Sequence, residues 1–98
     1  MNDLTNKTIL VAGGAGYLGS SLCKAILSNK GNLSIADIDE KKINILLDSL
    51  KTEYPSAKIL SVKLDIKNEN SILECVNKTH QYFGSIDGLV NATFGSTN

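Results

Sequence analysis

The chain alternates between short apolar runs and longer stretches whose apolar residues recur at helical spacing. Thr8 to Ala12 is almost wholly apolar, as expected for a strand covered on both faces of a parallel sheet. Leu33 to Ala36, followed by Asp37, and Gly88 to Ala92 have the same character. Lys58 to Leu64 instead alternates between apolar and polar positions, and a lysine in such a segment is typical of an edge strand. The pattern predicts four strands.

Three stretches between these strands have apolar residues three and four positions apart, which predicts helices. The first extends from about Tyr17 to Asn29, and Gly31 is expected in the left-handed conformation that closes it. Asp39 is the expected N-cap of the second helix, and Asn68 or Asn70 that of the third. The predicted apolar stripes consist of Leu18, Leu22, Ala25 and Ile26; of Ile43, Leu46, Leu47, Leu50 and Tyr54; and of Ile72, Cys75, Val76, Thr79 and Phe83.

The order β-α-β-α-β-α-β predicts an α/β fold with right-handed crossovers and a parallel sheet. It matches the first half of a doubly wound, Rossmann-type fold with strand order 3-2-1-4. We therefore expect residues 1–98 to form a partial dinucleotide-binding domain. In this arrangement the fourth strand has an open edge, through which the chain is expected to pair with itself or another chain.

A glycine-rich turn connects the first predicted strand to the first helix. Counted from Gly14 the letters read G-x-G-x-x-G, and counted from Gly13 they read G-x-x-G-x-x-G. Such a turn directs backbone N–H groups and a helix N-terminus at one point, where a pyrophosphate binds. Gly19 would allow the helix to lie close to the strand.

Asp37 stands at the end of the second predicted strand, 18 positions after Gly19. A carboxylate at this place accepts hydrogen bonds from the adenosine ribose and repels a 2′-phosphate. We therefore expect NAD as the cofactor, with NADP less favoured. The alternative is that Asp37 only begins a turn or caps a helix, although Asp39 is better placed to cap.

Further candidates follow the other two strands. Asp65 and Ile66 end the third strand, where they could border the adenine or simply begin a loop. Asn91, Ala92 and Thr93 end the fourth strand, where small residues leave room for a ribose. The Asn91 amide could tie strands together, or Asn91 could simply be a buried residue whose polar atoms are satisfied by the backbone.

Composition excludes several classes of function. Ten basic and ten acidic side chains cancel, so the chain shows no charge pattern for nucleic acid or an anionic membrane. No apolar run approaches the ~20 residues that span a bilayer.

The histidine and the cysteines are assigned no chemistry. His80 is interpreted as a surface residue, and no cluster of residues has the spacing of a metal site. Cys23 and Cys75 are interpreted as reduced, buried residues of a cytoplasmic protein.

With these residues described, the chain resembles the N-terminal half of the short-chain dehydrogenase/reductase family from about Leu4 to Phe94. The segment Ala12 to Gly19 is similar to the T-G-G-A-G-[FY]-[IL]-G motif of the extended, sugar-nucleotide-handling branch. Phe83 to Ala92 is similar to the F-G-x-I-D-x-L-V-N-N-A-G segment of the shorter branch. This mixture resembles oxidoreductases grouped with flagellin glycan modification and nonulosonate synthesis.

The resemblance implies a role for each matching residue. Gly13, Gly16, Tyr17, Leu18 and Gly19 would surround the pyrophosphate. Asp37 would bind the ribose, Asp65 and Ile66 the adenine, and Asn91, Ala92 and Thr93 the adenosine side near the fourth strand. Ile38, directly after Asp37, is also expected among the cofactor-binding residues. Two departures are Ala12 in place of Thr, and Ala92-Thr93-Phe94 in place of N-A-G.

The family's catalytic Ser and Tyr-x-x-x-Lys have no counterpart here. Tyr82 has Ile86 four positions on, and the Tyr54–Lys58 pair spans Pro55. The resemblance thus implies an NAD(H)-binding segment truncated before the catalytic half of a hydride-transferring oxidoreductase, with no catalytic residue of its own and no turnover alone. The alternatives are a non-catalytic nucleotide-binding or assembly module, and the N-terminal part of a sugar-nucleotide epimerase or dehydratase. An S-adenosylmethionine-dependent methyltransferase would share the glycine turn but not Phe83 to Ala92.

Overall fold

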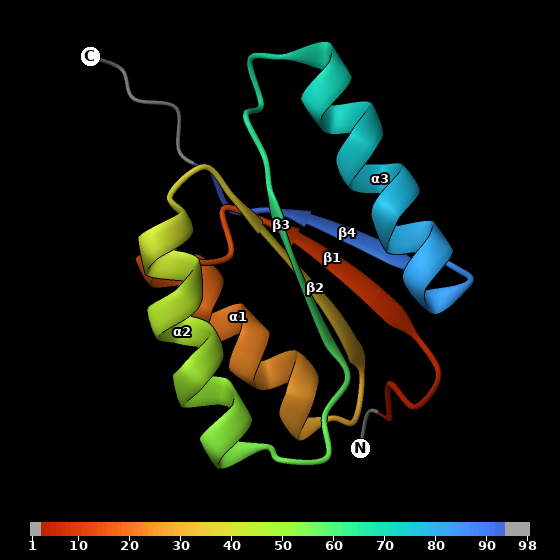
Figure 1. Cartoon of the computed structure of the whole chain (residues 1–98). Coiled ribbons are helices and arrows are strands. Elements are labelled where there is room, and N and C mark those ends of the chain that lie inside the picture. Colours follow the sequence, from red (N-terminus) through yellow and green to blue (C-terminus); the bar gives the residue numbers. More distant parts are fainter. Residues whose placement is uncertain (1–2, 94–98) are drawn as a thin grey trace.

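The computed structural model of the chain describes residues 3–93, which form four strands and three helices in strict alternation (Figure 1). The elements are β1 (Thr8–Ala12), α1 (Tyr17–Ser28), β2 (Asn32–Asp37), α2 (Glu40–Glu53), β3 (Ile59–Lys63), α3 (Glu69–Phe83) and β4 (Gly88–Asn91). Each expected strand and helix is present, with boundaries within one or two residues of the prediction. The alternation of periods along the sequence therefore identified every element of the described chain.

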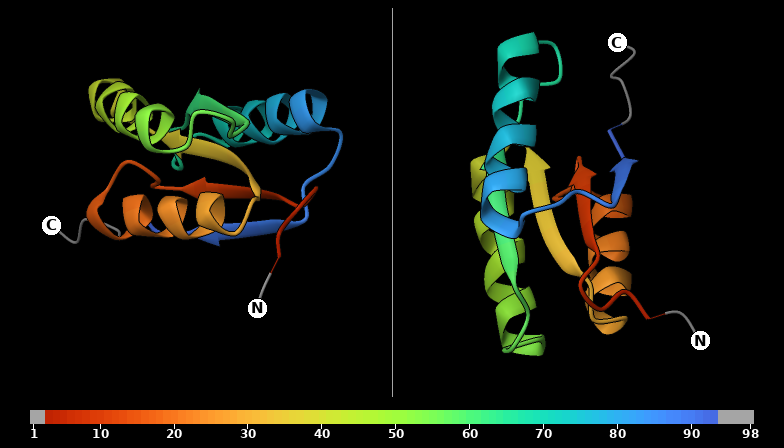
Figure 2. Two further views of the ribbon diagram at one scale, coloured as in Figure 1. Left: turned by 90° about the horizontal axis from the view of Figure 1, so that it is seen from below. Right: turned by 90° about the vertical axis from the view of Figure 1, so that its right-hand side faces the viewer.

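The strands form one parallel sheet in the order β3-β2-β1-β4. Thr8 is in register with Asn32, and Ile9 with Gly88. Figure 2 shows the strands pointing in the same direction, so their carboxyl ends meet at one edge of the sheet. The predicted 3-2-1-4 order is confirmed, and so is the position of β3 at an edge.

Two hydrophobic clusters cover opposite faces of the sheet, because neighbouring residues of a strand point to opposite sides. The buried cluster on the α1 and α2 side consists of Val11, Cys23, Ile26, Leu27, Leu33, Ile35, Ile43 and Leu50. The cluster on the α3 side consists of Leu10, Ala12, Ala36, Val62, Leu64 and Cys75. Both faces of β1 and β2 are therefore covered, which explains their nearly continuous apolar sequences.

The predicted apolar stripe of α1 was only partly correct. The buried residues of this helix are Gly19, Cys23, Ile26 and Leu27. Leu18 is instead 45% exposed, and Ala25 is also exposed. The buried stripe is rotated because Gly19, which has no side chain, is the residue that packs on the β1–α1 turn.

The end of α1 also differs from the prediction. Lys30, not Gly31, has the left-handed conformation, with φ 68°. Gly31 N–H donates to the Ile26 carbonyl at 3.0 Å, and Lys30 N–H donates to the Leu27 carbonyl at 3.0 Å. These two bonds are those of a Schellman ending, in which the residue before Gly31 takes the positive φ. Gly31 is nevertheless in a tight position, since an added Cβ would lie 2.8 Å from Ile26 Cγ2.

The caps of the other helices agree with the sequence. The Asp39 side chain accepts a hydrogen bond from Lys42 N–H at 3.1 Å at the start of α2. Asn68, rather than the alternative Asn70, caps α3 by accepting from Ser71 N–H at 3.2 Å. Gly84 ends α3 in the left-handed conformation, with φ 86°. Among the described residues, no helix is long and apolar enough to cross a membrane.

Candidate functional site

A cleft of about 770 Å³ opens at the carboxyl ends of the strands. Residues that follow each of the four strands contribute to its wall, so the parallel sheet brings together segments far apart in the sequence. Its lining consists of Gly13, Gly16, Tyr17, Leu18, Asp37, Ile38, Asp39, Lys42, Leu64, Asp65, Ile66, Lys67, Ala92 and Thr93. In doubly wound folds, ligands bind at this edge.

The amides of the β1–α1 turn fall into two groups. Gly13 and Gly14 N–H both donate to the Ala36 carbonyl, at 2.7 and 3.1 Å. Gly16 N–H donates to the Gly13 carbonyl at 3.1 Å. The first-turn amides of α1, those of residues 17–19, are by contrast the groups that a helix leaves without an intrahelical partner. These amides, with the positive end of the helix dipole, are the available donors for an anion.

Two glycines of the turn lie where an added side chain would have no room. Gly13 has φ +76°, and a Cβ there would lie 2.8 Å from Thr93 N and 2.9 Å from the carbonyl carbon of Ala92. A Cβ at Gly14 would lie 2.7 Å from Ile35 Cγ2. The turn is therefore pressed between the ends of β2 and β4, and any side chain at these two positions would push it out of place.

Asp37 lies where β2 meets the cleft and is half-buried. One of its carboxylate oxygens, Oδ2, accepts from Ala15 N–H at 3.0 Å, and the other, Oδ1, accepts from Asp39 N–H at 3.0 Å. These bonds hold the carboxylate at the rim of the turn. Since each carboxylate oxygen has more than one lone pair, both can still accept from hydroxyls of a ligand.

The cleft also has an apolar rim. Tyr17 is 95% exposed, Ile38 58% and Ile66 44%, and Leu18 lines the cleft beside them. Large apolar side chains that remain exposed around one concavity mark a binding surface. Ile38 and Ile66 follow β2 and β3, so they lie on the side of the cleft farther from the turn.

The fourth strand contributes only part of what the sequence predicted. Ala92 and Thr93 line the cleft, whereas Asn91 is exposed and is not part of the lining. The Asn91 side chain accepts from Thr93 N–H at 3.0 Å, so it stabilises a local turn and does not tie strands together. Gly19 also lies outside the lining, beneath the turn. Phe94, the third residue of the departure from N-A-G, lies outside the described residues.

Four residues of the cleft were missed by sequence reasoning, namely Asp39, Lys42, Leu64 and Lys67. Asp39 was recognised only as a helix cap. Lys42 lies in the first turn of α2, directly after the loop that carries Asp37, and this short distance in sequence was the available signal. Lys42 and Lys67 bring positive charge to the cleft, which partly balances the negative charge of Asp37, Asp39 and Asp65.

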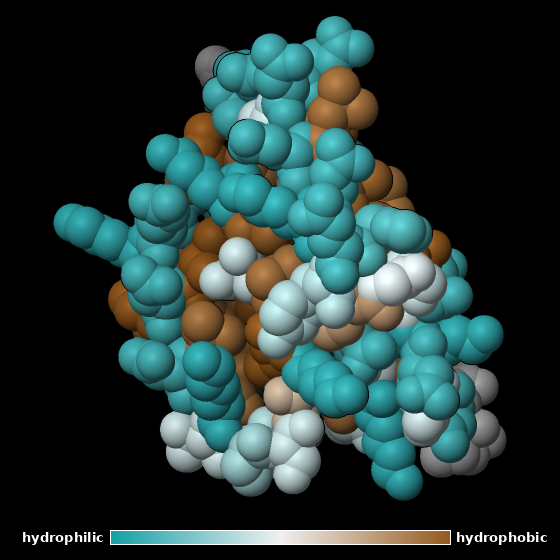
Figure 3. Space-filling view, turned by 45° about the vertical axis from the view of Figure 1, so that its right-hand side comes forward, coloured by the Kyte–Doolittle hydropathy of each residue, from teal (hydrophilic) through white to brown (hydrophobic). Residues whose placement is uncertain are grey.

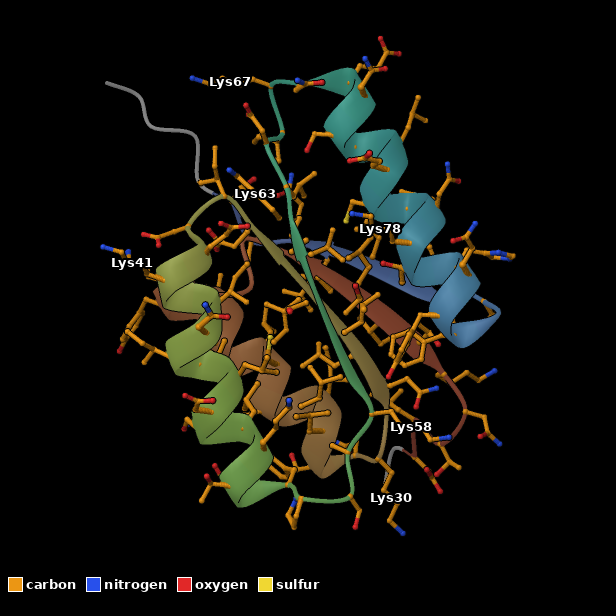
Figure 4. All side chains as sticks on the ribbon, in the orientation of Figure 1. Lys30, Lys41, Lys58, Lys63, Lys67 and Lys78 are labelled. Atoms are coloured by element: carbon orange, nitrogen blue, oxygen red, sulfur yellow. The ribbon has the colours of Figure 1, made fainter. Side chains whose placement is uncertain are left out.

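The opposite end of the sheet has different chemistry. In Figure 4, Lys63 and Lys67 lie at the end of the molecule where β3 finishes, whereas Lys30 and Lys58 lie at the other end.

Tyr54 is the C-cap of α2 and Lys58 follows a turn, so the two residues do not occupy consecutive helical turns. His80 is exposed, as expected. Within residues 3–93, no group of three or more His, Cys, Asp or Glu could hold a metal ion.

The sequence model of the short chain dehydrogenase family matches residues 7–97. The post-translational flagellin modification protein A of Campylobacter coli is 40% identical over 91 residues, covering 93% of this chain and 35% of that protein. The NADPH-bound structure of a short chain oxidoreductase from Pseudomonas aeruginosa PAO1 superposes with a TM-score of 0.92 at 19% identity, over 97% of this chain and 37% of that one. An oxidoreductase of Haemophilus influenza with bound NAD has a TM-score of 0.87 at 25% identity, over 98% and 34% of the two chains.

These comparisons and the geometry agree. The chain spans about a third of the length of the proteins it matches. Its turn, cleft and strand order lie within the matched region. The chain therefore belongs to the short chain dehydrogenase family, and its described residues form a Rossmann-type segment of the kind that binds NAD(P).

Proposed function

We propose that this chain is the NAD(H)-binding segment of an oxidoreductase that transfers hydride between NAD and a carbonyl or alcohol substrate. The observation that carries the proposal is the cleft, in which the unpaired first-turn amides of α1 and the Asp37 carboxylate border one space. Amide donors suit a pyrophosphate, and a carboxylate suits a pair of ribose hydroxyls. The two groups together match the two ends of an adenosine diphosphate unit.

Each part of the cleft has a defined task in this proposal. The amides of Tyr17 and Leu18 bind the pyrophosphate, and Gly13 and Gly16 keep side chains away from it. Gly19 supports this part of the site from beneath the turn, where it lets α1 begin close to β1. Asp37 accepts hydrogen bonds from the adenosine ribose. Ile38 and Ile66 enclose the adenine, with Asp65 toward its exocyclic amine, while Ala92 and Thr93 close the cleft beside the turn. The nicotinamide of the bound dinucleotide supplies the hydride chemistry.

NAD is proposed over NADP because of the charge at the end of β2. Asp37 and Asp39 both border the cleft there, and two carboxylates repel a 2′-phosphate. Lys42 lies on the same wall and partly offsets this repulsion. Structural relatives are found with either dinucleotide, so the local charge of this chain is what supports the choice.

Proton transfer belongs to the complete enzyme in this proposal. The family's catalytic Ser and Tyr-x-x-x-Lys have no match in the 98 residues, so we expect binding without turnover. The 40% identity to a flagellin modification protein supports a role for that enzyme in the same kind of modification. Two buried, free cysteines suit a reducing compartment, and we propose the cytoplasm.

Titration of the chain with NADH, NADPH and S-adenosylmethionine tests the proposal. We expect NADH to bind, NADPH to bind more weakly, and S-adenosylmethionine, which has no pyrophosphate, not to bind. Equal affinity for NADH and NADPH would overturn the choice of NAD. Binding of S-adenosylmethionine in preference to NADH would overturn the proposal as a whole.

A second candidate function is assembly through β4, and the exposure of Leu89 favours it. Leu89 is in register with Leu10 of the α3-side cluster, yet it is 65% exposed. On the other face, Val90 lines an apolar groove of about 460 Å³ together with Ile9, Leu22 and Ile26. Figure 3, turned so that the right-hand side of Figure 1 comes forward, shows hydrophobic residues exposed between hydrophilic ones on that face.

The proposed partner is a second copy of the chain, paired along the β4 edge. Because the formal net charge is zero, overall charge repulsion does not oppose the approach of two copies. Sedimentation over a range of concentrations tests this, with Leu89→Lys expected to yield a monomer. Ile45→Lys is the matched control, since Ile45 is 72% exposed on α2, away from the edge. A monomeric parent chain at high concentration would contradict self-association.

A further inference from the structure

Three successive amides of the turn between β1 and α1 donate hydrogen bonds to β2. Gly13 and Gly14 N–H donate to the Ala36 carbonyl, and Ala15 N–H donates to Asp37 Oδ2 at 3.0 Å. The first two of these bonds are to backbone and are available whatever the sequence of β2. The third is to a side chain, so it depends on the residue at position 37. One of the three hydrogen bonds that hold the turn against β2 therefore depends on the Asp37 side chain.

The Asp37 carboxylate is itself held in place from the other side. Asp39 N–H donates to Asp37 Oδ1 at 3.0 Å, and Leu64 N–H donates to the Asp37 carbonyl at 2.9 Å. The Asp37 backbone is also in register with Lys63 of β3. The carboxylate thus connects the turn to a part of the sheet that is itself hydrogen-bonded to β3.

We propose that Asp37 is a positioning residue for the phosphate-binding turn, in addition to accepting hydrogen bonds from the ribose; this inference rests on the proposed function. Ala15 is followed directly by Gly16, the N-cap of α1, and by Tyr17, whose amide is a proposed pyrophosphate donor. Fixing the Ala15 amide fixes the start of the helix. Without that bond, the turn must order itself when the ligand arrives, and binding is weaker by the cost of that ordering.

A substitution at position 37 that is meant to switch the cofactor has two opposing effects. Replacing Asp37 with a small neutral residue removes repulsion of the 2′-phosphate, but it also releases Ala15. We therefore expect Asp37→Ala to lose affinity for NADH without a matching gain for NADPH. Asp37→Asn has the same charge as Asp37→Ala and keeps one oxygen that can accept from Ala15 N–H. These two uncharged variants are compared because only Asn offers an acceptor to Ala15 N–H, although its single oxygen replaces the two that serve Ala15 and Asp39 in the parent chain.

The test is binding of 2′,3′-dideoxyadenosine 5′-diphosphate, a probe that has the pyrophosphate and no ribose hydroxyls. The parent chain, Asp37→Asn, Asp37→Ala and the control Asp48→Asn, an exposed position on α2, are titrated with this probe and with NADH. We expect Asp37→Asn to bind the probe about tenfold more tightly than Asp37→Ala, the effect of about one hydrogen bond. The control is expected to match the parent chain.

Equal affinity of the two Asp37 variants for the probe would overturn the positioning role, while NADH binding by the parent chain would leave the proposed function intact. If the parent chain binds neither ligand, both proposals fail.

Amide hydrogen exchange provides a second measurement, which needs no ligand. We expect the Ala15 amide to exchange faster in Asp37→Ala than in Asp37→Asn, with the Leu33 amide of the buried core unchanged. Equal Ala15 rates would also overturn the inference, and a change at Leu33 would indicate a general loss of stability instead.

Discussion

Gly19 and Gly13 are in direct backbone contact: a Cβ built on Gly19 would lie 2.1 Å from the Gly13 carbonyl oxygen. The same atom would lie 2.8 Å from the Gly14 Cα. Helix α1 can begin this close to β1 only because Gly19 has no side chain. The contact determines how far the amides of the first helical turn extend into the cleft.

Gly19→Ala is therefore expected to damage both stability and binding. The obstacle is backbone, which cannot rotate away as a flexible side chain can, so α1 or the turn must shift at a cost of about 1–3 kcal/mol. Gly16→Ala is the control, because its nearest neighbour would be 3.4 Å away and its φ is −77°. Urea unfolding of both variants checks the loss of stability, and NADH titration of Gly19→Ala against the parent chain checks the loss of binding, because Gly16 itself borders the cleft. A Gly19→Ala variant as stable as Gly16→Ala would contradict the packing described.

Local signals in the sequence were sufficient for most of the fold. Asp39 and Asn68 cap their helices by bonding amides three positions on, so each is specified by its immediate neighbours. The lysines near β3 marked it as an edge strand, and the sheet order confirms this. Asp37 could be placed at the cleft because parallel strands share one carboxyl edge.

Features that depend on packing between distant segments were not accessible in this way. The apolar face of α1 turned out to include Gly19 and not Leu18, because hydrophobicity alone does not reveal that a glycine is the closest contact. Lys30 took the positive φ expected of Gly31, because the helix ends one residue earlier than the glycine indicated and the Schellman bonds make Lys30 the left-handed residue.

A buried pair of hydroxyls between β2 and α3 provides a second prediction. Thr79 Oγ1 donates to the Cys75 carbonyl at 2.9 Å, which uses its one proton, so Ser34 must be the donor in the 2.8 Å contact between the two hydroxyls. Thr79→Val then leaves the Ser34 hydroxyl buried without an acceptor, and we expect a loss of about 1–3 kcal/mol. Ser34→Ala should cost less, because Thr79 keeps its bond to Cys75. Urea unfolding of both single variants and the double variant gives the coupling; additive losses would contradict the bond.

The stability of the fold is expected to fall in acid partly through Asp87. Thr8 N–H, which donates to Asp87 Oδ2 at 2.8 Å, holds the pKa of that carboxyl below its usual range, with a smaller contribution from Ser85. A lowered pKa stabilises the fold above the unfolded value of about 3.9, and this contribution disappears as the pH falls through the folded pKa. Asp87→Asn should therefore flatten the decline in the urea midpoint below about pH 4, whereas Asp48→Asn should not. Parallel curves for the parent and Asp87→Asn would exclude this role.

The cysteines provide the last prediction, because both are buried in the sheet–helix interfaces. Cys23 has no exposed surface, and burial raises the pKa of its thiol to about 12, while the pKa of Cys75 is raised by burial in the same sense. The thiolate is the reactive form, so a neutral and inaccessible thiol reacts only when the protein opens. Iodoacetamide labelling at pH 8 should proceed at a rate that increases with urea in parallel with unfolding. Rapid labelling of Cys23 in the folded chain would mean that α1 separates from the sheet without global unfolding, and the turn that α1 supports would then not be held in place before a ligand binds.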